Sequence, residues 1–397
     1  MSAPRIAIIG AGPGGLTLAS ILQKNGVKCT IFELDASRTS RDQGGIVDLH
    51  SQAGQLALRE AGILGGGGGG VEKNTIPLGE AMKLIKSDGT VCWDESHTKH
   101  VEHATSRDRP EILRSKLRDI LLDSVEPASI QWNRKLVRVE QAEGTHIKYN
   151  LHFTDSVEEG FDLVVGTDGA WSRVRPLVTD VEPHYSGVTI VELKAAQAST
   201  KKQWLSNFMG TGTLFMFDKD RALASGNLGL GLWNRLAKAR ICKESFGKRY
   251  FADCHADLKC VIASEASNGL ITRPLYMLPI GTKWAPRAGI TLLGDAAHLI
   301  TPFAGVGVNV TMADALSLSR AIIERKDDFG VDPNTSLAEA IKEYEEPMFE
   351  RARENMEMTW SGLEGHFSVD GIDQLVRLLE GQIKMEAMIA VEKLETS

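Results

Sequence analysis

The chain has 397 residues, of which 42% are hydrophobic, which is enough apolar material for a large core divided among two or three domains. Its formal net charge is −7. This argues against non-specific binding to nucleic acid or to an anionic membrane surface, because both require a basic face.

The cysteine pattern excludes several kinds of site. The five cysteines are odd in number and show no CxxC spacing, so neither a disulfide framework nor a thiol redox pair is expected. This usage favours a cytoplasmic location. Cys254, His255 and Cys260 lack a fourth ligand at usable spacing, and no metal site is predicted.

Neither a signal peptide nor a membrane span is expected. The first predicted strand begins almost at once after the N-terminal residue, which leaves no room for a signal peptide. The most apolar later stretch, residues 290–310, contains Asp295, His298 and Pro302, and such residues do not suit a membrane span. We expect a monomer.

The first predicted elements are a strand, a glycine-rich turn and a helix. Ile6 to Ile9 form an unbroken apolar run that ends at Gly10, typical of a parallel strand buried on both faces. In the Gly10-x-Gly12-x-x-Gly15 pattern, the first glycine permits a tight turn, the second lets the backbone contact a pyrophosphate, and the third lets the helix pack on the strand. The helix directs its N-terminal amides at the phosphates.

A second strand and an acidic residue complete this unit. The helix ends at Asn25-Gly26, and Val27 to Phe32 predict a strand that ends in Glu33. The carboxylate lies 18 residues after Gly15, where such folds hold a ribose hydroxyl. Together these elements predict a dinucleotide site, whereas the glycines alone would also suit a structural turn.

The next segments predict mixed structure. Residues 44–50 predict a short strand, 52–61 a helix, and 81–93 a hairpin. Six glycines at 65–70 suit a mobile loop or a linker. Residues 111–125 predict an amphipathic helix with Arg114 in its first turn.

From residue 130 onward the sequence predicts strands, then a mostly antiparallel layer, and then a buried strand and helices again. Strands are predicted at 130–140, 148–153 and 161–166, and a mostly antiparallel layer between 181 and 273. Further on, the patterns predict a buried strand at 288–293 and helices at 308–324, 337–360 (kinked at Pro347) and 372–394.

Two later stretches decide which dinucleotide is expected. Asp168-Gly169 ends one predicted strand where a helix begins, and Gly294-Asp295-Ala296-Ala297-His298 ends another. Asp295 is placed to accept hydrogen bonds from polyol hydroxyls, and Gly294 removes the side chain that would block their approach. The amides of residues 307–309 open a helix whose positive end could stabilise negative charge on a ring oxygen.

These features favour FAD, because a simple NAD dehydrogenase has no use for a second cradle on a long ribityl chain. The alternative is that Asp295 is an N-cap and that Gly305 and Gly307 are ordinary turn residues. The predicted fold is α/β, a discontinuous Rossmann-like FAD-binding domain with a mostly antiparallel β-sheet substrate domain and a C-terminal helix. The FAD-binding parts would be 1–75, 106–180 and 274–335, the substrate parts 76–105 and 181–273, and the helical tail 336–397.

The chain resembles the FAD-dependent aromatic-hydroxylase class of monooxygenases over nearly its whole length. Three motifs carry the resemblance: Gly10-Ala11-Gly12-Pro13-Gly14-Gly15, Asp168-Gly169 and Gly294-Asp295-Ala296-Ala297-His298. Within that class, residues 44–50, the Leu113-Arg114-Ser115-x-Leu117-Arg118 helix and residues 302–309 look most like the tetracycline-inactivating monooxygenases. These stretches surround flavin rather than substrate.

The resemblance implies a set of cofactor contacts. Glycines of the first turn would hold the pyrophosphate, Glu33 the adenosine ribose, and Arg114 and Asp295 the ribityl and phosphate region, while Arg41 and Asp48 match positions beside the flavin. The full set is Gly10, Gly12, Pro13, Gly14, Gly15, Glu33, Arg41, Asp48, Arg114, Asp168, Asp295, Pro302, Gly305, Gly307, Val308 and Asn309. For Arg41 and Asp48, solvated charge and a strand-end turn are the alternatives.

The resemblance also has gaps. Leu34 stands where the tetracycline enzymes carry a basic residue, and the segment 188–231 matches their substrate-contacting strands poorly. Neither their mode of reductant binding nor any substrate residue is carried over. Substrate would lie between the flavin ring and the 181–273 layer, with Phe215, Phe217, Met216, Pro302 and Gly305 as candidate wall residues, although alternating aromatics are more often core.

The implied activity needs no catalytic side chain. NAD(P)H would reduce FAD, O₂ would add at flavin C4a, and the hydroperoxide would hydroxylate an electron-rich aromatic or enolic polycyclic molecule, with a tetracycline-like compound as one candidate. His298 is interpreted as structural. The alternatives are a flavin-dependent reductase of isoprenoid chains and a non-catalytic escort protein that keeps the glycine fold; a halogenase would need a Trp-x-Trp-x-Ile-Pro segment, which is absent.

Overall fold

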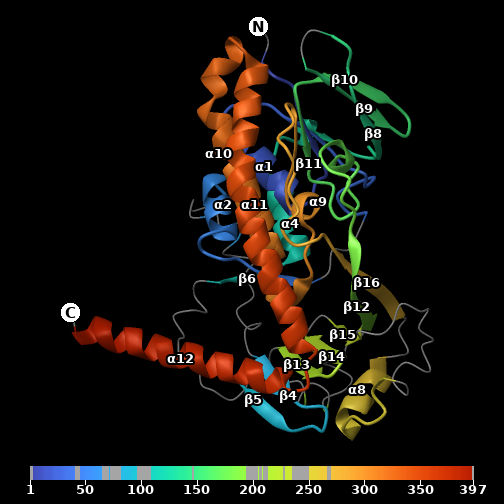
Figure 1. The fold of residues 1–397 in the computed structure, drawn as a ribbon, viewed down its shortest axis with the longest axis vertical. Coiled ribbons are helices and arrows are strands. Elements are labelled where there is room, and N and C mark those ends of the chain that lie inside the picture. Colours follow the sequence, from blue (N-terminus) through green and yellow to red (C-terminus); the bar gives the residue numbers. More distant parts are fainter. Residues whose placement is uncertain are drawn as a thin grey trace. The chain divides into compact units, whose positions relative to one another are not determined.

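The computed structural model describes residues 3–40, 45–64, 71, 82–95, 109–144, 147–193, 204, 208, 213–226, 229–234, 250–265 and 270–395 (Figure 1). The chain divides into two compact units. Unit 1 comprises residues 1–76, 104–184 and 276–360, and unit 2 comprises 77–103, 185–275 and 361–397. Each unit is therefore built from three separate segments of the chain.

A five-stranded parallel sheet forms the centre of unit 1. Its order is β17-β11-β1-β2-β7, with bounds Ile290–Leu292, Leu163–Gly166, Ile6–Ile9, Thr30–Phe32 and Ile130–Gln131. Every residue of β1 and β11 is buried, as expected of parallel strands covered on both faces. The predicted α/β class is confirmed.

Helices of unit 1 pack closely because small residues lie between them. Helix α1 contacts α10, α4 and α2, and an added Cβ at Gly14 of α1 would lie 2.5 Å from Thr311 of α10. The helices are α1 (Pro13–Lys24), α2 (Gly54–Glu60), α4 (Arg114–Asp123), α9 (Asp295–His298) and α10 (Gly307–Glu324). Short 3₁₀ helices cover Pro127–Ser129, Arg175–Leu177, Pro302–Ala304 and Lys326–Gly330.

The segment predicted as a helix over 111–125 begins differently. Residues Glu111–Leu113 form strand β6, which pairs with β3 (Ile46–Asp48), and the helix starts at Arg114. The backbone amide of Arg114 donates to the Gly45 carbonyl at 3.0 Å. Pairing with a strand distant in sequence thus replaces the first helical turn. A separate antiparallel sheet contains β8 (Leu136–Gln141), β9 (Tyr149–Phe153) and β10 (Val157–Phe161).

Unit 2 is built on a seven-stranded, mostly antiparallel sheet with the order β16-β12-β15-β14-β13-β4-β5. The bounds are Leu270–Met277, His184–Leu193, Gly229–Asn234, Arg221–Gly226, Thr213–Asp218, Met82–Ile85 and Val91–Asp94. In this sheet β13 and β4 pair in parallel, whereas β12–β15, β15–β14, β14–β13 and β4–β5 pair antiparallel. Helix α8 spans Ala256–Glu265, and α12 spans Gly371–Glu395 and contacts β13 and β5.

Strand β13 presents two different faces. Leu214 and Met216 are buried in a core with Phe251 and Leu258. Phe215 and Phe217 alternate with them and stack on each other, with ring centroids 5.7 Å apart. The period of two along a strand places these aromatic rings on the opposite face of the sheet.

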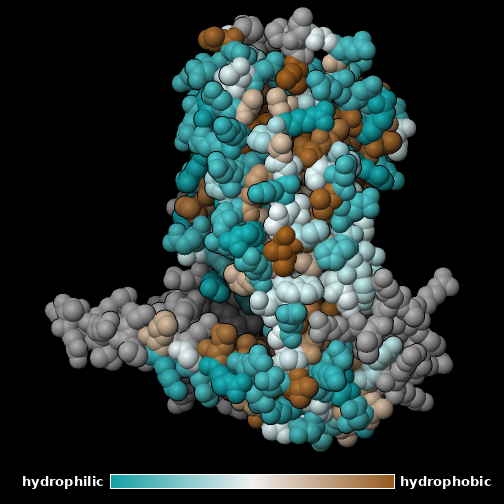
Figure 2. Space-filling view, in the orientation of Figure 1, coloured by the Kyte–Doolittle hydropathy of each residue, from teal (hydrophilic) through white to brown (hydrophobic). Residues whose placement is uncertain are grey.

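The helix α11 (Pro333–His366) continues through Pro347. Its residues as far as 360 belong to unit 1 and the remainder to unit 2. None of the helices in the described parts of the chain combines the length and the apolar character that a membrane span requires. On the face drawn in Figure 2, hydrophobic side chains of unit 1 are interspersed among hydrophilic ones, which is normal for a protein surface in contact with water.

Candidate functional site

The glycine-rich turn after β1 gives each of its glycines a different environment. Gly10 has φ +114°, and an added Cβ there would lie 2.6 Å from the Thr167 carbonyl oxygen. At Gly15 the Cβ would collide with the Gly10 carbonyl and would lie 2.6 Å from Thr167 Oγ1. At Gly12 nothing lies within 4 Å. The turn is therefore tightly packed on the protein side and open only at Gly12, as contact with a ligand through bare backbone requires.

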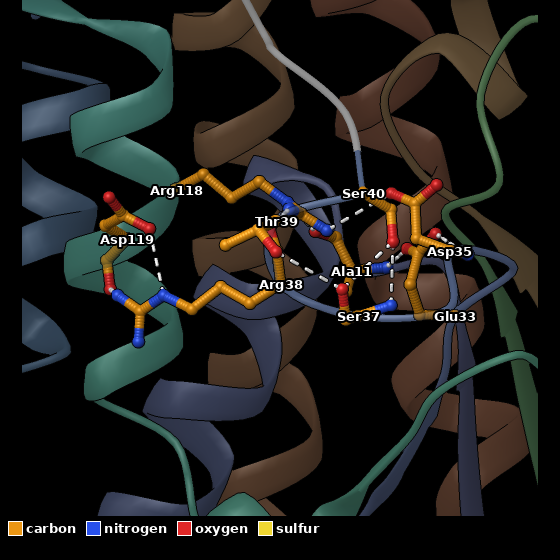
Figure 3. A network of polar contacts seen from close by, with 9 residues as sticks. All are labelled: Ala11, Glu33, Asp35, Ser37, Arg38, Thr39, Ser40, Arg118 and Asp119. Carbon is orange, nitrogen blue, oxygen red and sulfur yellow. Dashed lines mark hydrogen bonds and ion pairs between the residues drawn. The ribbon is translucent and has the colours of Figure 1, made fainter.

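Glu33 fixes this turn to the end of β2. Its carboxylate accepts hydrogen bonds from the amides of Ala11 (2.6 Å) and Asp35 (2.9 Å), and the residue is only 3% exposed (Figure 3). Glu33 thus holds the glycine turn and the following loop in place. Its expected contact with a ribose remains a prediction.

Arg118 is a residue of this network to which the sequence analysis assigned no role. Its Nε donates to the Ala11 carbonyl (3.2 Å) and its Nη1 to the Arg38 carbonyl (3.0 Å), while Asp35 lies 3.5 Å away (Figure 3). Arg118 lies one turn after Arg114 on α4 and is buried. A buried arginine in a helix needs acceptors, but the sequence pattern alone did not say which.

Asp295 is the first residue of α9 and lies three residues after the end of β17. The N-cap of α9 is Gly294, which has φ +61°, and no side chain caps the helix, so Asp295 is not the N-cap that the alternative interpretation required. Asp295 is exposed to solvent, yet burial raises the pKa of its carboxyl group, against the opposing charges of His298, Arg114 and Arg175. The Asp295 carboxyl group is therefore accessible to solvent, although the protein around it disfavours its charged form.

Two further candidates lie at the start of α4 and at the end of β3. Arg114 is the first residue of α4, is exposed, and acts electrostatically on Asp295. Asp48, at the end of β3, accepts a hydrogen bond from His50 Nε2 at 2.9 Å. Burial opposes ionisation of Asp48, but the His50 contact brings its pKa below the ordinary value.

Arg175 joins the Asp168 turn to the Asp295 turn, and the sequence analysis gave it no role. The guanidinium donates to three carbonyls, those of Ala296 (2.7 Å), Asp295 (2.9 Å) and Ala170 (3.0 Å). Burial lowers its pKa, while Asp168 and Asp295 oppose that shift. Its position seven residues after Asp168 was visible in the sequence, but its acceptors belong to a distant segment.

Only one of the two carboxylate oxygens of Asp168 has a hydrogen-bond partner among the described residues. Its Oδ2 accepts the Arg173 amide at 2.7 Å, whereas Oδ1 is buried and has no hydrogen-bond partner among the described residues. Burial raises the pKa of this carboxyl group, partly offset by contacts from Ser172 and the Arg173 amide. A buried oxygen left without a donor indicates that a ligand group can complete the site.

The loop between α9 and α10 combines an open and a fixed part. Pro302 and Gly305 are exposed, Gly305 has φ +70°, and no atom lies near the Cβ positions of Gly305 or, within 3.8 Å, of Gly307. Val308 is half-buried and packs against the core of unit 1.

Asn309 is 2% exposed, and its side chain is taken up by the protein. Its Oδ1 accepts the amides of His50 (2.8 Å) and Gly54 (3.3 Å), and its Nδ2 donates to the Asp48 carbonyl (2.9 Å). If Asn309 contacts a flavin, it does so through its backbone in the first turn of α10.

Not all predicted residues can be placed together. Arg41 lies outside the described residues. Phe215 and Phe217 belong to unit 2, where Phe217 stacks on His366 with ring centroids 4.2 Å apart. Met216, which the sequence analysis grouped with them as a wall candidate, is fully buried on the other side of the sheet. That expectation ignored the alternation of side chains along the strand.

Four turns of the candidate site meet at one edge of the unit 1 sheet. Gly10, Thr167 and Glu33 directly follow β1, β11 and β2, and Gly294 lies two residues after the end of β17. These are adjacent parallel strands. Their carboxyl ends therefore meet, at the position where open α/β sheets bind ligands. The bare backbone at Gly12, the unpartnered Asp168 oxygen and the accessible Asp295 carboxyl fit a long molecule with a pyrophosphate and a polyol chain, as FAD has. No cluster of metal ligands occurs among the described residues.

Comparisons with known proteins agree with this geometry. The sequence matches the family model of the FAD binding domain over residues 4–227 and 283–330. The monooxygenase penA of Penicillium thymicola is 31% identical over 439 residues, and the alignment covers 95% of this chain and 98% of that relative.

Two solved structures have a similar fold. Klebsiella pneumoniae HpxO complexed with FAD and uric acid has a TM-score of 0.70 at 21% identity, covering 96% of this chain and 92% of that one. Tetracycline destructase Tet(55) has a TM-score of 0.72 at 17% identity, covering 97% of each chain. The chain belongs to the family of FAD-dependent monooxygenases that are built on this FAD binding domain.

Proposed function

We propose that this enzyme uses NAD(P)H and O₂ to hydroxylate an electron-rich aromatic or enolic polycyclic small molecule. The observation that carries the proposal is the convergence of four strand ends, with the Gly12 backbone, Asp168 and Asp295 along one edge of the unit 1 sheet. Bound FAD would supply the redox and oxygen-transfer chemistry, while the protein supplies position and exclusion of water.

The protein's own groups have separate tasks in this proposal. The Gly12 backbone would approach the pyrophosphate, and Asp295 would accept hydrogen bonds from ribityl hydroxyls. Arg114 would offset the negative charge of the Asp295 carboxylate. The backbone amides of residues 307–309, at the positive end of the 18-residue helix α10, would stabilise negative charge on the flavin ring. No side chain needs to transfer a proton for these tasks.

For the substrate we propose a planar, oxygen-rich polycycle of the tetracycline kind. The fold likeness to a tetracycline destructase supports this class. The half-buried ring of Phe215 in unit 2, which stacks on the buried Phe217, also supports it, because an aromatic ring packs well against a flat molecule. The cysteine pattern further supports action in the cytoplasm, and we expect a monomer.

The test is to follow NAD(P)H oxidation and O₂ uptake by the FAD-loaded protein across phenols, polyketides and tetracyclines, with product mass as the readout. We expect one class to stimulate both rates together and to gain one oxygen atom. If FAD binds but no compound stimulates consumption above the idle rate, monooxygenation is the wrong activity. If the protein binds no FAD, the escort alternative is favoured instead.

A further inference from the structure

A buried carboxylate lies directly behind the Asp295 turn. Asp314 of α10 is 0% exposed. Its Oδ2 accepts a hydrogen bond from the Gly294 amide (3.1 Å) and lies 2.5 Å from His298 Nε2. Gly294 and His298 are the N-cap and the last residue of the four-residue helix α9. One oxygen atom therefore holds both ends of the helix whose first residue is Asp295.

The second oxygen of Asp314 connects this turn to α11. Oδ1 accepts from Arg351 Nη2 (2.8 Å) and Nε (3.2 Å). Burial opposes ionisation of Asp314, yet His298 and Arg351 bring its pKa below the ordinary value. Burial likewise opposes protonation of His298, but the Asp314 carboxylate raises its pKa. The group is a buried ion cluster in which each charge is paired, the arrangement that makes such a cluster tolerable.

The backbone around Asp314 leaves little freedom for α9 to move by itself. Gly294 has φ +61°, and an added Cβ there would lie 2.8 Å from Thr311 of α10. Helix α10 thus carries both the surface on which the Gly294 turn rests and, at residues 307–309, the amides directed at the site. The position of Asp295 relative to those amides depends on how the turn is fastened to α10.

We propose that Asp314 is a positioning residue of the flavin site, which fastens the Asp295 turn to helix α10 so that the Asp295 carboxylate and the α10 amides act on the same cofactor. This inference rests on the proposed function, because it takes Asp295 to be a FAD contact. Asp314 acts through its contacts with Gly294 and His298, and it touches no ligand itself.

The first experiment compares Asp314→Asn with Glu345→Gln in the full-length protein. Glu345 is also a buried carboxyl of unit 1, bonded to Trp284 (2.9 Å) and Thr291 (2.8 Å), but it lies outside the Asp314 contacts. We expect the FAD dissociation constant of Asp314→Asn to rise roughly tenfold or more, because the turn that carries Asp295 loses the charged group that fastens it to α10. The control should stay within about twofold of the unaltered protein, whatever its thermal stability.

A double-mutant cycle separates this inference from the proposed function. If Asp314 acts through Asp295, the Asp314→Asn change should have little further effect on FAD affinity in the Asp295→Ala protein. Additive losses would overturn the positioning role. If Asp295→Ala by itself leaves FAD affinity unchanged, the proposed cofactor site is wrong, and the inference falls with it.

The midpoint potential of the bound flavin gives a readout that instability alone does not change. Loosening the turn should separate the flavin from the α10 amides and shift the potential to more negative values, whereas loss of the carboxylate's charge alone would shift it to more positive values. A positive shift with unchanged affinity would overturn the proposal. If Asp314→Asn does not fold, His298→Gln tests the same contact from its other side, and unchanged FAD affinity there would also contradict the proposal.

Discussion

Gly12 and Gly15 lie three residues apart in one turn, yet replacing each by alanine should have different consequences. A Cβ at Gly12 meets nothing within 4 Å, and its φ of −79° is ordinary, so Gly12→Ala should fold normally and lose FAD affinity through contact with the cofactor. A Cβ at Gly15 would collide with the Gly10 carbonyl, so Gly15→Ala should destabilise the FAD-free protein by about 1–3 kcal/mol. Denaturant unfolding without FAD, and FAD titration, distinguish the two; equal losses of stability would contradict this assignment.

His366 gives unit 2 a predictable response to pH. Burial lowers its pKa from 6.5 to about 4, and its ring stacks on Phe217. Because the folded-state pKa lies below the unfolded value, the unfolded chain takes up the proton first, and stability falls as the pH drops from the unfolded pKa towards the folded one. Between pH ~7.5 and pH ~5 this group should cost about 2 kcal/mol.

The variant His366→Phe should remove that part of the pH dependence while keeping the ring stack. Urea unfolding of both proteins at the two pH values measures the difference. An identical pH dependence in the variant would show that other groups are responsible.

At the scale of elements, one side chain of α10 holds the loop between β3 and α2. The buried side chain of Asn309 accepts a hydrogen bond from the His50 amide and donates one to the Asp48 carbonyl. Asn309→Ala should therefore lower the free energy of unfolding by about 1–3 kcal/mol, since it leaves these backbone groups without partners. Chemical denaturation measures the loss, and protection of the His50 amide from hydrogen exchange should fall with it. Unchanged protection would contradict the assigned role.

The element boundaries also show where local pattern is insufficient. The apolar spacing over 111–125 predicts a helix from its first residue, but Glu111–Leu113 pair with Ile46–Asp48 instead. The strand partner lies more than sixty positions earlier in the sequence, and pairing with it outweighs the helical preference of three residues. Helix α10 and strand β1, by contrast, begin and end close to their predicted positions. In both elements the packing in the folded protein favours the same structure that the local sequence pattern favours.

At the scale of the whole molecule, the two units have separate hydrophobic cores, and the candidate FAD contacts lie in unit 1. FAD should raise the melting temperature of the protein in a concentration-dependent way, because a ligand at about one hundred times its Kd adds roughly 2.7 kcal/mol to the folded state. Calorimetry with increasing FAD measures the shift. The Gly12→Ala protein is the matched control, and an equal shift in that variant would exclude binding at the glycine turn.

Much of the candidate site could be predicted from the sequence, because each of its turns is encoded by a short segment of the chain. The spacing of three glycines, an acidic residue after a second apolar run, and the Asp-Gly and Gly-Asp pairs after later runs each follow from short segments of sequence. Each predicts a strand that ends in a turn with a free backbone or a carboxylate. Parallel pairing then requires those turns to lie at one edge of the sheet, which determines the fold class and predicts where the candidate site lies.

The partners of individual side chains were decided only by the tertiary structure. Glu33 binds the Ala11 amide, Arg175 binds carbonyls of the Asp295 turn, and Asp314 holds both ends of α9. These groups are brought together by packing between segments as much as 120 residues apart, as for Arg175 and Asp295. Spacing along the chain determines which turns form, but a hydrogen-bond partner depends on which atoms the folded core brings within about 3 Å.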